Sequence, residues 1–169
     1  MHASAAACAI ALAAGLAGCS ATVDLKRTLQ VSDVSGGYYD AGVVNGRNKL
    51  IPTITVTLHK STAAELRPLS LNVVFKRLPP KGDTGAPSAQ AEEDFDEKFI
   101  QTVAFNGMQT DPLTVRANAG YTGDPPQSRA DMLAHSQFRD IRVHLFAKHS
   151  ASQWVEIAQY TLPRQLLVH

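Results

Sequence analysis

Short runs in which apolar and polar residues alternate constrain the fold of this chain more than any other feature. In residues 52–59, isoleucine, valine and leucine alternate with three threonines, and residues 69–76 alternate in a similar way. A period of two predicts a β-strand with one buried and one exposed face. Residues 141–145 and 154–162 form a last pair of such runs, so we expect a β protein.

Three less regular runs complete a predicted set of about seven strands. They cover residues 23–33, 99–105 and 113–115. Asn106-Gly107 follows the second of them and predicts a hairpin, because both residues tolerate a positive φ. No sustained helical period competes with these runs. We therefore expect an all-β, immunoglobulin-like sandwich of two antiparallel sheets.

Long connections separate the predicted strands at residues 34–51, 78–96 and 118–138. The second is rich in proline and glycine and ends in an acidic cluster, so we expect a mobile loop. The third contains Ser128 and, three residues on, Asp131, which can cap one short helix. If the strands run alternately up and down, all three connections leave from the pole opposite the start of the first strand. A small hairpin at Asn45-Gly46 inside the first connection would add two strands and leave this arrangement intact.

The N-terminal segment carries an uncharged, mainly apolar run over residues 5–17. A helix that spans a membrane needs about 20 such residues, so this shorter run predicts the core of a signal peptide. The alternative is a buried alanine-rich helix. The run closes with Leu16-Ala17-Gly18-Cys19, which resembles the lipobox of bacterial lipoproteins. This resemblance implies a signal peptide over residues 1–18 and a lipid on Cys19.

The same resemblance implies a short tether over residues 19–22 and a single domain over residues 23–169 at the periplasmic face of the cell envelope. Ser20 follows the cysteine. In Gram-negative lipoproteins an aspartate at that position favours retention in the inner membrane, so the outer membrane is the expected location. The order of the runs, with ITVTL at 54–58 followed by LNVVF at 71–75, also resembles small Ig-like domains of envelope lipoproteins.

Composition and motifs exclude several functions. The chain has 16 basic and 15 acidic residues and a net charge of +1, so no global field attracts nucleic acid. Its two cysteines, Cys8 and Cys19, are removed or acylated if the lipobox is used, which excludes thiol catalysis and cysteine metal sites. No phosphate-binding loop or G-x-S-x-G elbow occurs, and Ser136 beside His135 has no evident third partner.

Metal binding is not expected either. The histidines beyond the predicted signal peptide show no local spacing typical of zinc ligands; they are His59, His135, His144, His149 and His169. The acidic group Asp94, Asp96 and Glu97 lacks the glycine and spacing of a calcium loop. We therefore expect no metal, no cofactor and no catalysis. Trp154, on the last predicted hairpin, is expected to pack in the core or on the sheet.

The first and third long connections hold the residues best suited to a partner contact, because tyrosine and arginine are typical anchors of interfaces. The predicted contact residues are Tyr38, Tyr39, Asp40, Arg47, Asn48, Tyr121, Asp124 and Arg129. The alternative is that the tyrosines only close the open end of the sandwich. The expected function is that of a lipid-anchored binding or assembly module that contacts an envelope protein. A structural or glycan-binding module, which needs an aromatic shelf, and an envelope hydrolase are the alternatives.

Overall fold

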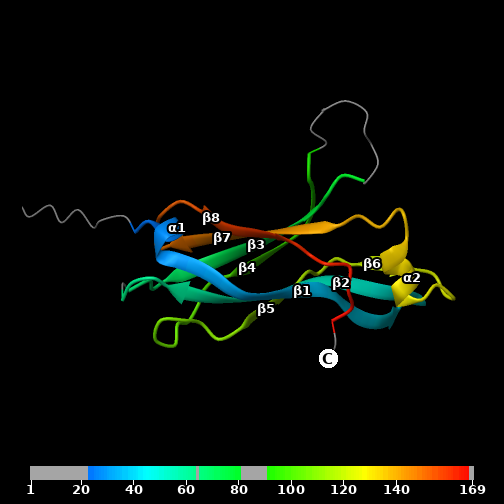
Figure 1. Ribbon diagram of the computed structural model, residues 1–169, viewed down its shortest axis with the longest axis horizontal. Coiled ribbons are helices and arrows are strands. Elements are labelled where there is room, and N and C mark those ends of the chain that lie inside the picture. Colours follow the sequence, from blue (N-terminus) through cyan, green and yellow to red (C-terminus); the bar gives the residue numbers. More distant parts are fainter. Residues whose placement is uncertain (1–22, 64, 81–90, 168–169) are drawn as a thin grey trace, which may run out of the picture.

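A computed structural model of the protein describes residues 23–63, 65–80 and 91–167 and places eight strands in two antiparallel sheets (Figure 1). In sheet A, β2 pairs with the other three strands, and the members are β1 (Leu29–Val44), β2 (Arg47–Lys60), β5 (Leu113–Arg116) and β6 (Tyr121–Gly123). Sheet B contains, in spatial order, β4 (Glu93–Ile100), β3 (Leu69–Arg77), β7 (Ile141–His149) and β8 (Val155–Thr161). The two short helices are α1 (Leu25–Thr28) and α2 (Arg129–Ala134). The predicted all-β, two-sheet sandwich is confirmed.

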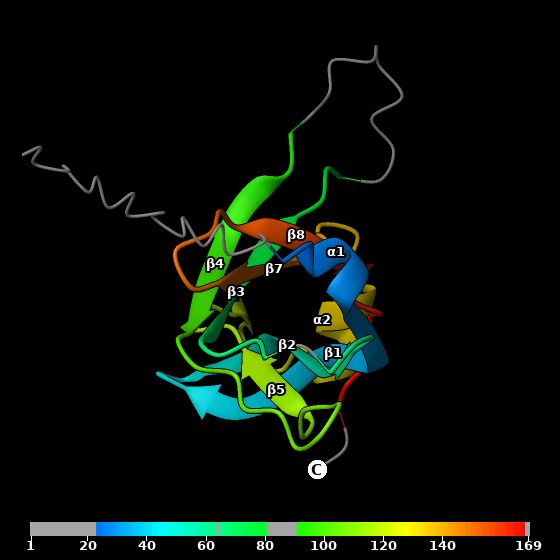
Figure 2. The same ribbon diagram turned by 90° about the vertical axis from the view of Figure 1, so that its left-hand side faces the viewer.

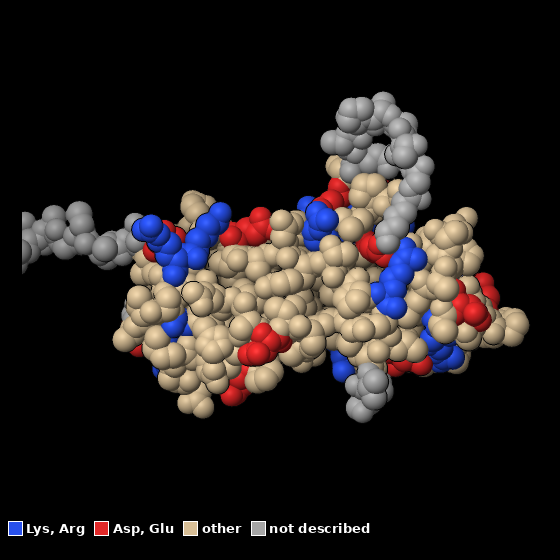
Figure 3. Space-filling model, viewed as in Figure 1, with Lys and Arg blue, Asp and Glu red and all other residues tan. Residues whose placement is uncertain are grey.

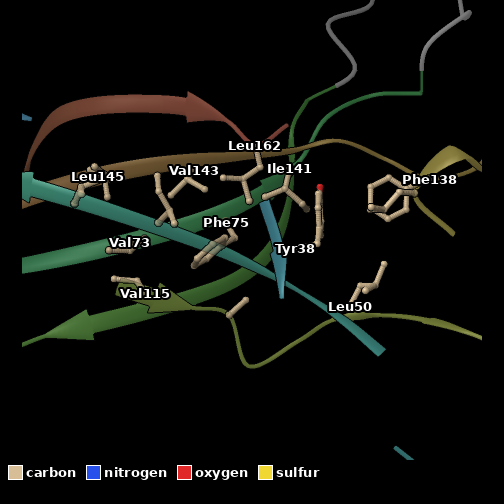
Figure 4. Close-up of a cluster of buried hydrophobic side chains, with 14 of the residues drawn as sticks. Tyr38, Leu50, Val73, Phe75, Val115, Phe138, Ile141, Val143, Leu145 and Leu162 are labelled. Carbon is tan, nitrogen blue, oxygen red and sulfur yellow. The ribbon is translucent and has the colours of Figure 1, made fainter. Parts of the chain in front are cut away.

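The two sheets face each other across a layer of apolar side chains (Figures 2 and 4). Alternate residues of β3 and β7 point into this layer, among them Val73, Phe75, Val143 and Leu145, and all four are fully buried. Ile54 of β2 faces them from sheet A. Burial of one such side chain stabilises the fold by about 1.5–3 kcal/mol. The regular alternation that predicted these strands is therefore also the source of the core.

The chain enters sheet A later than the sequence predicted. Residues 25–28 form α1 and not the start of a strand, because the Asp24 side chain accepts hydrogen bonds from the backbone N–H groups of Lys26 and Arg27, at 3.1 and 3.4 Å. The predicted strand 23–33 therefore begins at Leu29. Leu25 is buried, so α1 closes the edge of the sandwich between β1 and β8.

The predicted long loop over residues 34–51 is wrong. β1 continues to Val44 and pairs with β2 along its length, and Asn45-Gly46 alone forms the turn, with φ values of 52° and 77°. Gly36 and Gly37 interrupt the alternation of apolar and polar residues, so the sequence pattern did not predict a strand here. Their backbone must accept a close neighbour, because a Cβ on Gly37 would lie 2.7 Å from the carbonyl oxygen of Gln165.

Two predictions around the acidic cluster also need correction. β4 begins at Glu93, so the predicted loop 78–96 ends earlier, and its residues 81–90 lie outside the described part. β4 ends at Ile100, so the predicted strand 99–105 stops early as well. Asn106-Gly107 forms a tight turn, but it lies in a connection that crosses from sheet B to sheet A. An Asn-Gly pair specifies a local turn and does not specify which strands pair.

The sandwich is elongated, and its two ends differ (Figure 1). The α1 end contains α1, the connection between β2 and β3 and the turn between β7 and β8. The α2 end contains the Asn45-Gly46 turn, β6 and α2. The predicted helix after Ser128 is confirmed as α2, with both hydrogen bonds of the capping box to Asp131. The first described residue, Val23, thus lies at the end opposite α2.

The surface carries no single charged patch on the side where β1 and β8 face the viewer. Figure 3 shows lysine and arginine side chains interspersed with aspartate and glutamate there. This mixture agrees with the near-neutral net charge of the chain. Among the described residues, neither helix is long and apolar enough to cross a membrane.

The close approach at Gly37 leads to a first prediction. Gly37→Ala places a methyl group against the Gln165 carbonyl, and we expect it to lower the free energy of unfolding by about 1–3 kcal/mol. Urea unfolding followed by circular dichroism measures this loss. Ser35→Ala, at an exposed site two residues away, is the control and should change stability by less than about 0.5 kcal/mol. We call residues 162–167, which follow β8, the C-terminal segment. Equal stabilities of the two variants would show that this segment does not pack tightly against β1.

Candidate functional site at the α2 end

The α2 end is built from a helix held against sheet A. Ser128 Oγ accepts a hydrogen bond from the backbone N–H of Asp131, and the Asp131 carboxylate accepts one from the backbone N–H of Ser128, both at 3.1 Å. Hydrogen bonds from the Ser128 side chain and backbone lower the pKa of the Asp131 carboxyl group. Gly123 lets the helix pack closely, because a Cβ there would lie 2.9 Å from the Met132 side chain.

Polar links connect this helix and the residues before it to the β1–β2 hairpin. Arg129 Nε lies 3.0 Å from the carboxylate of Asp40 on β1, and both side chains are about two-thirds buried. Arg47, beside the hairpin turn, pairs with Asp124 at 2.7 Å. The Asn48 side chain, which is buried, donates a hydrogen bond to the carbonyl of Gln127 at 2.6 Å.

An aromatic cluster closes the core at this end (Figure 4). The ring of Tyr38 is fully buried and meets the ring of Phe138 edge-on, with centroids 5.1 Å apart. The centre of the Tyr121 ring lies 4.4 Å from that of Phe138, and the same ring stacks on Phe95 with the two centres 5.4 Å apart. Sequence analysis offered two roles for the tyrosines, contact with a partner or closure of the open end of the sandwich. Tyr38 and Tyr121 have the second role.

Neither tyrosine is suited to acid–base chemistry. Burial raises the pKa of the Tyr38 hydroxyl, and the nearby Tyr121 and Asp140 raise it further. Burial also raises the pKa of Tyr121, whose hydroxyl donates a hydrogen bond to the carbonyl of Arg139 at 2.8 Å. Both phenols remain protonated at neutral pH, so their role here is packing.

Arg164 joins the C-terminal segment to the α2 end. Its guanidinium pairs with Asp140 at 2.5 Å and donates to the carbonyls of Phe138 and Leu133 at 2.7 and 3.2 Å. The same group lies 5.1 Å from the centre of the Phe138 ring. One side chain thus fixes the chain after α2, the start of β7 and the end of β8 relative to one another.

The predicted contact residues separate into two groups. Tyr38 has no exposed surface and cannot touch a partner in this fold, whereas Tyr39 points to the opposite face of β1 and packs its ring 3.7 Å from the Arg116 guanidinium. Asp40, Asn48, Tyr121 and Arg129 brace the α2 end, as described above. Arg47 and Asp124 are the most exposed of the set, and they pair with each other.

Surface hollows and apolar side chains lie beside these two charges. A hollow of about 300 Å³ is lined by residues that include Arg47, Asp124 and Met132. At the hairpin tip, Val43 is 61% exposed and Val44 is 39% exposed. A second hollow, of about 480 Å³, lies between α2 and the C-terminal segment and is lined by Ala130, Leu133, Ala134, Arg164, Gln165 and Leu166.

Polar side chains around the first hollow are engaged in contacts within the protein. His135 borders the first hollow, but its Nδ1 already accepts a hydrogen bond from the backbone of Gln137 at 3.2 Å. Arg47 and Asp124, which also line this hollow, form an ion pair with each other. Within residues 23–63, 65–80 and 91–167, no group of three histidine, cysteine or carboxylate side chains is placed to hold a metal.

Sequence reasoning missed Val43, Val44 and the C-terminal segment. The two valines were included in a predicted polar loop, and only the Asn-Gly turn marked the hairpin that exposes them. Nothing in the sequence indicated that Leu166 would form a bridge with Tyr38. Comparisons with protein-family models, with curated proteins and with solved structures found no match.

The buried Arg164–Asp140 pair and the exposed Arg47–Asp124 pair should contribute differently to stability, and this difference can be tested. Arg164→Met removes three hydrogen bonds and the arginine partner of the buried Asp140, so we expect a loss of about 2–4 kcal/mol in the free energy of unfolding. Arg47→Met opens a solvent-exposed pair and should cost less than about 1 kcal/mol. Urea unfolding of both variants gives the comparison. A larger loss for Arg47→Met would overturn this description of the α2 end.

Proposed function

We propose that the protein is a lipid-anchored binding module of the bacterial envelope that contacts a partner protein through its α2 end. The observation that carries this proposal is the exposed apolar hairpin tip, Val43 and Val44, held in place beside a surface hollow. Exposed apolar side chains next to a charged rim are typical of protein contact surfaces. The contact is non-catalytic.

Rigidity of the surface supports this function. The hairpin tip continues two paired strands, and the Arg47–Asp124 pair and the Asn48–Gln127 hydrogen bond tie it to the segment before α2. A preorganised surface loses little conformational entropy when a partner binds. Leu166, which is 40% exposed, adds apolar area beside α2.

The position of the surface also supports it. Val23 lies at the α1 end, and Cys19 precedes it by only four residues in the sequence. A lipid on Cys19 would hold the α1 end next to the membrane and direct the α2 end away from it. An exposed apolar surface in that position faces the space in which other envelope proteins lie.

Site-specific crosslinking tests the partner contact. Benzoylphenylalanine, a photo-reactive residue, replaces Val44 in one variant of the full chain and Met108 in another, expressed in a Gram-negative host that contains the native partners. Met108 is the matched control, since it is 43% exposed but lies in the connection between β4 and β5. After irradiation, we expect one protein adduct from the Val44 position and none from the Met108 position.

A charge at the tip should weaken the same contact. Val43→Asp in the Val44 crosslinking variant should reduce the adduct at least about tenfold, because a buried carboxylate without a partner opposes association. Adducts from both positions, or an adduct that survives Val43→Asp unchanged, would contradict a specific contact at the α2 end.

The anchor is tested separately. Cys19→Ser removes the thiol that would carry the lipid, and we expect the protein to move from the membrane pellet to the soluble periplasmic fraction. Cys8→Ser, inside the predicted signal peptide, is the control and should leave the protein in the pellet. Fractionation and immunoblotting give the distribution. A Cys19→Ser variant that still sediments with membranes would refute the anchor and leave the partner contact to its own test.

A further inference from the structure

The outer face of sheet B carries aromatic side chains where a solvent-facing sheet usually carries polar ones. Asn72 on β3 lies directly between Phe99 of β4 and Phe146 of β7, and all three point away from the core. Phe99 is 61% exposed, and its ring centre lies 6.2 Å from that of Trp154, which is 39% exposed. We call Phe99, Phe146, Trp154 and Val74 the aromatic shelf.

A hollow of about 490 Å³ lies on this shelf. Its lining includes Val74, Phe146 and Trp154 and, on one side, the polar residues Lys76 and Glu97. The volume falls in the range of small-ligand sites, about 300–1,000 Å³. Neither described helix covers this face of the sheet (Figure 2).

Asn72, on the floor of the hollow, has an unsatisfied hydrogen-bond acceptor. Its side chain is 9% exposed, and its Oδ1 has no hydrogen-bond partner among the described residues. The amide orientation is fixed, because Nδ2 donates to Glu97 Oε1 at 2.5 Å and a rotated amide would set two acceptors against each other. A buried acceptor without a donor is costly, so a ligand hydroxyl group that reached this oxygen would stabilise the site.

The charges around the hollow favour a neutral ligand. Lys76 Nζ lies 3.2 Å from the Asp94 carboxylate at one side, and Lys148 Nζ lies 5.8 Å from the centre of the Trp154 ring at another. These two ammonium groups oppose a cation, and the carboxylates of Asp94 and Glu97 oppose an anion. A ligand with many hydroxyl groups can both donate to the carboxylates and Asn72 and accept from Lys76.

We propose that the aromatic shelf binds a neutral saccharide. One face of a sugar ring presents C–H groups that pack on aromatic rings, and its edge presents hydroxyl groups for Asn72, Glu97 and Lys76. Sequence analysis left a glycan-binding module open as an alternative that needs an aromatic shelf, which a groove lined by Tyr38, Tyr39 and Tyr121 would have favoured. The structure assigns the shelf to other residues, on a different face, and the inference does not depend on a partner at the α2 end.

Trp154 provides a direct measurement, because it is the single tryptophan of the chain. The full chain in mild detergent is titrated with three neutral, soluble oligosaccharides: chitotetraose, cellotetraose and maltotetraose. We expect a saturable change in tryptophan emission, with a shift to shorter wavelength, for at least one of them. Tetralysine and tetraglutamate serve as charged ligands of similar length and should give no change.

Two variants locate the binding. Phe99→Ala removes a mostly exposed ring and should weaken the sugar affinity about tenfold without loss of the fold, which circular dichroism verifies. Met108→Ala, a control at an exposed residue away from the shelf, should bind as the wild type does. Calorimetric titration gives both affinities without use of the tryptophan signal.

Three results would overturn the proposal. A saturable response to tetralysine or tetraglutamate alone would show that the shelf binds a charged ligand. No response to any of the three oligosaccharides at millimolar concentration would exclude neutral saccharide binding of useful strength. Equal weakening by Phe99→Ala and Met108→Ala would place the sugar elsewhere on the protein.

Discussion

The α2 end depends on how the backbone of Tyr38 is held. Its N–H donates to the carbonyl of Gln165 at 2.8 Å, and its carbonyl accepts from the N–H of Leu167 at 3.0 Å. The C-terminal segment thereby covers the free edge of β1 and satisfies backbone groups that an edge strand would otherwise expose. The ring of Tyr38 then lies fully inside the core against Phe138. Gly36 and Gly37 are needed at this point because no Cβ fits beneath the segment.

This constraint explains which part of the fold the sequence could predict. β7 alternates regularly because one face lies in the core and the other is partly exposed, and β3 does so with few exceptions. Apolar residues also alternate with threonines in β2 over residues 52–59. β1 departs from alternation where a second chain segment packs on its glycines, so its pattern resembled a loop. The sequence failed to predict the start of β4 for a different reason. As an edge strand with a half-exposed inner face, it accepts acidic residues that normally indicate a loop.

The candidate site was predictable only in part. The sequence identified some of the charged and aromatic residues of the α2 end but missed Phe138, Asp140 and Arg164. It also could not separate side chains that contact solvent from those that brace the structure. Arg129 and Asp40 are far apart in the chain and meet only after α2 docks. Trp154 was expected to pack on the sheet, which its contact with Phe99 bears out, yet the ring is also 39% exposed and lines a hollow. A tryptophan at the start of a strand gives no indication of which face it will occupy.

The two surfaces are distinct, but β4 touches both. Phe95 stacks on Tyr121 in the aromatic cluster of the α2 end and also lines the hollow on the aromatic shelf. The register between β3 and β4 shifts between Phe75 and Lys76, beside Phe95, and this irregularity turns that ring toward the cluster while Glu97 and Phe99 point outward. Because β4 pairs with a neighbour on one side only, it is less constrained than β3 or β7. A ligand on the shelf would therefore contact the same edge strand that packs at the α2 end, so energetic coupling between the two surfaces would have to involve the position of β4.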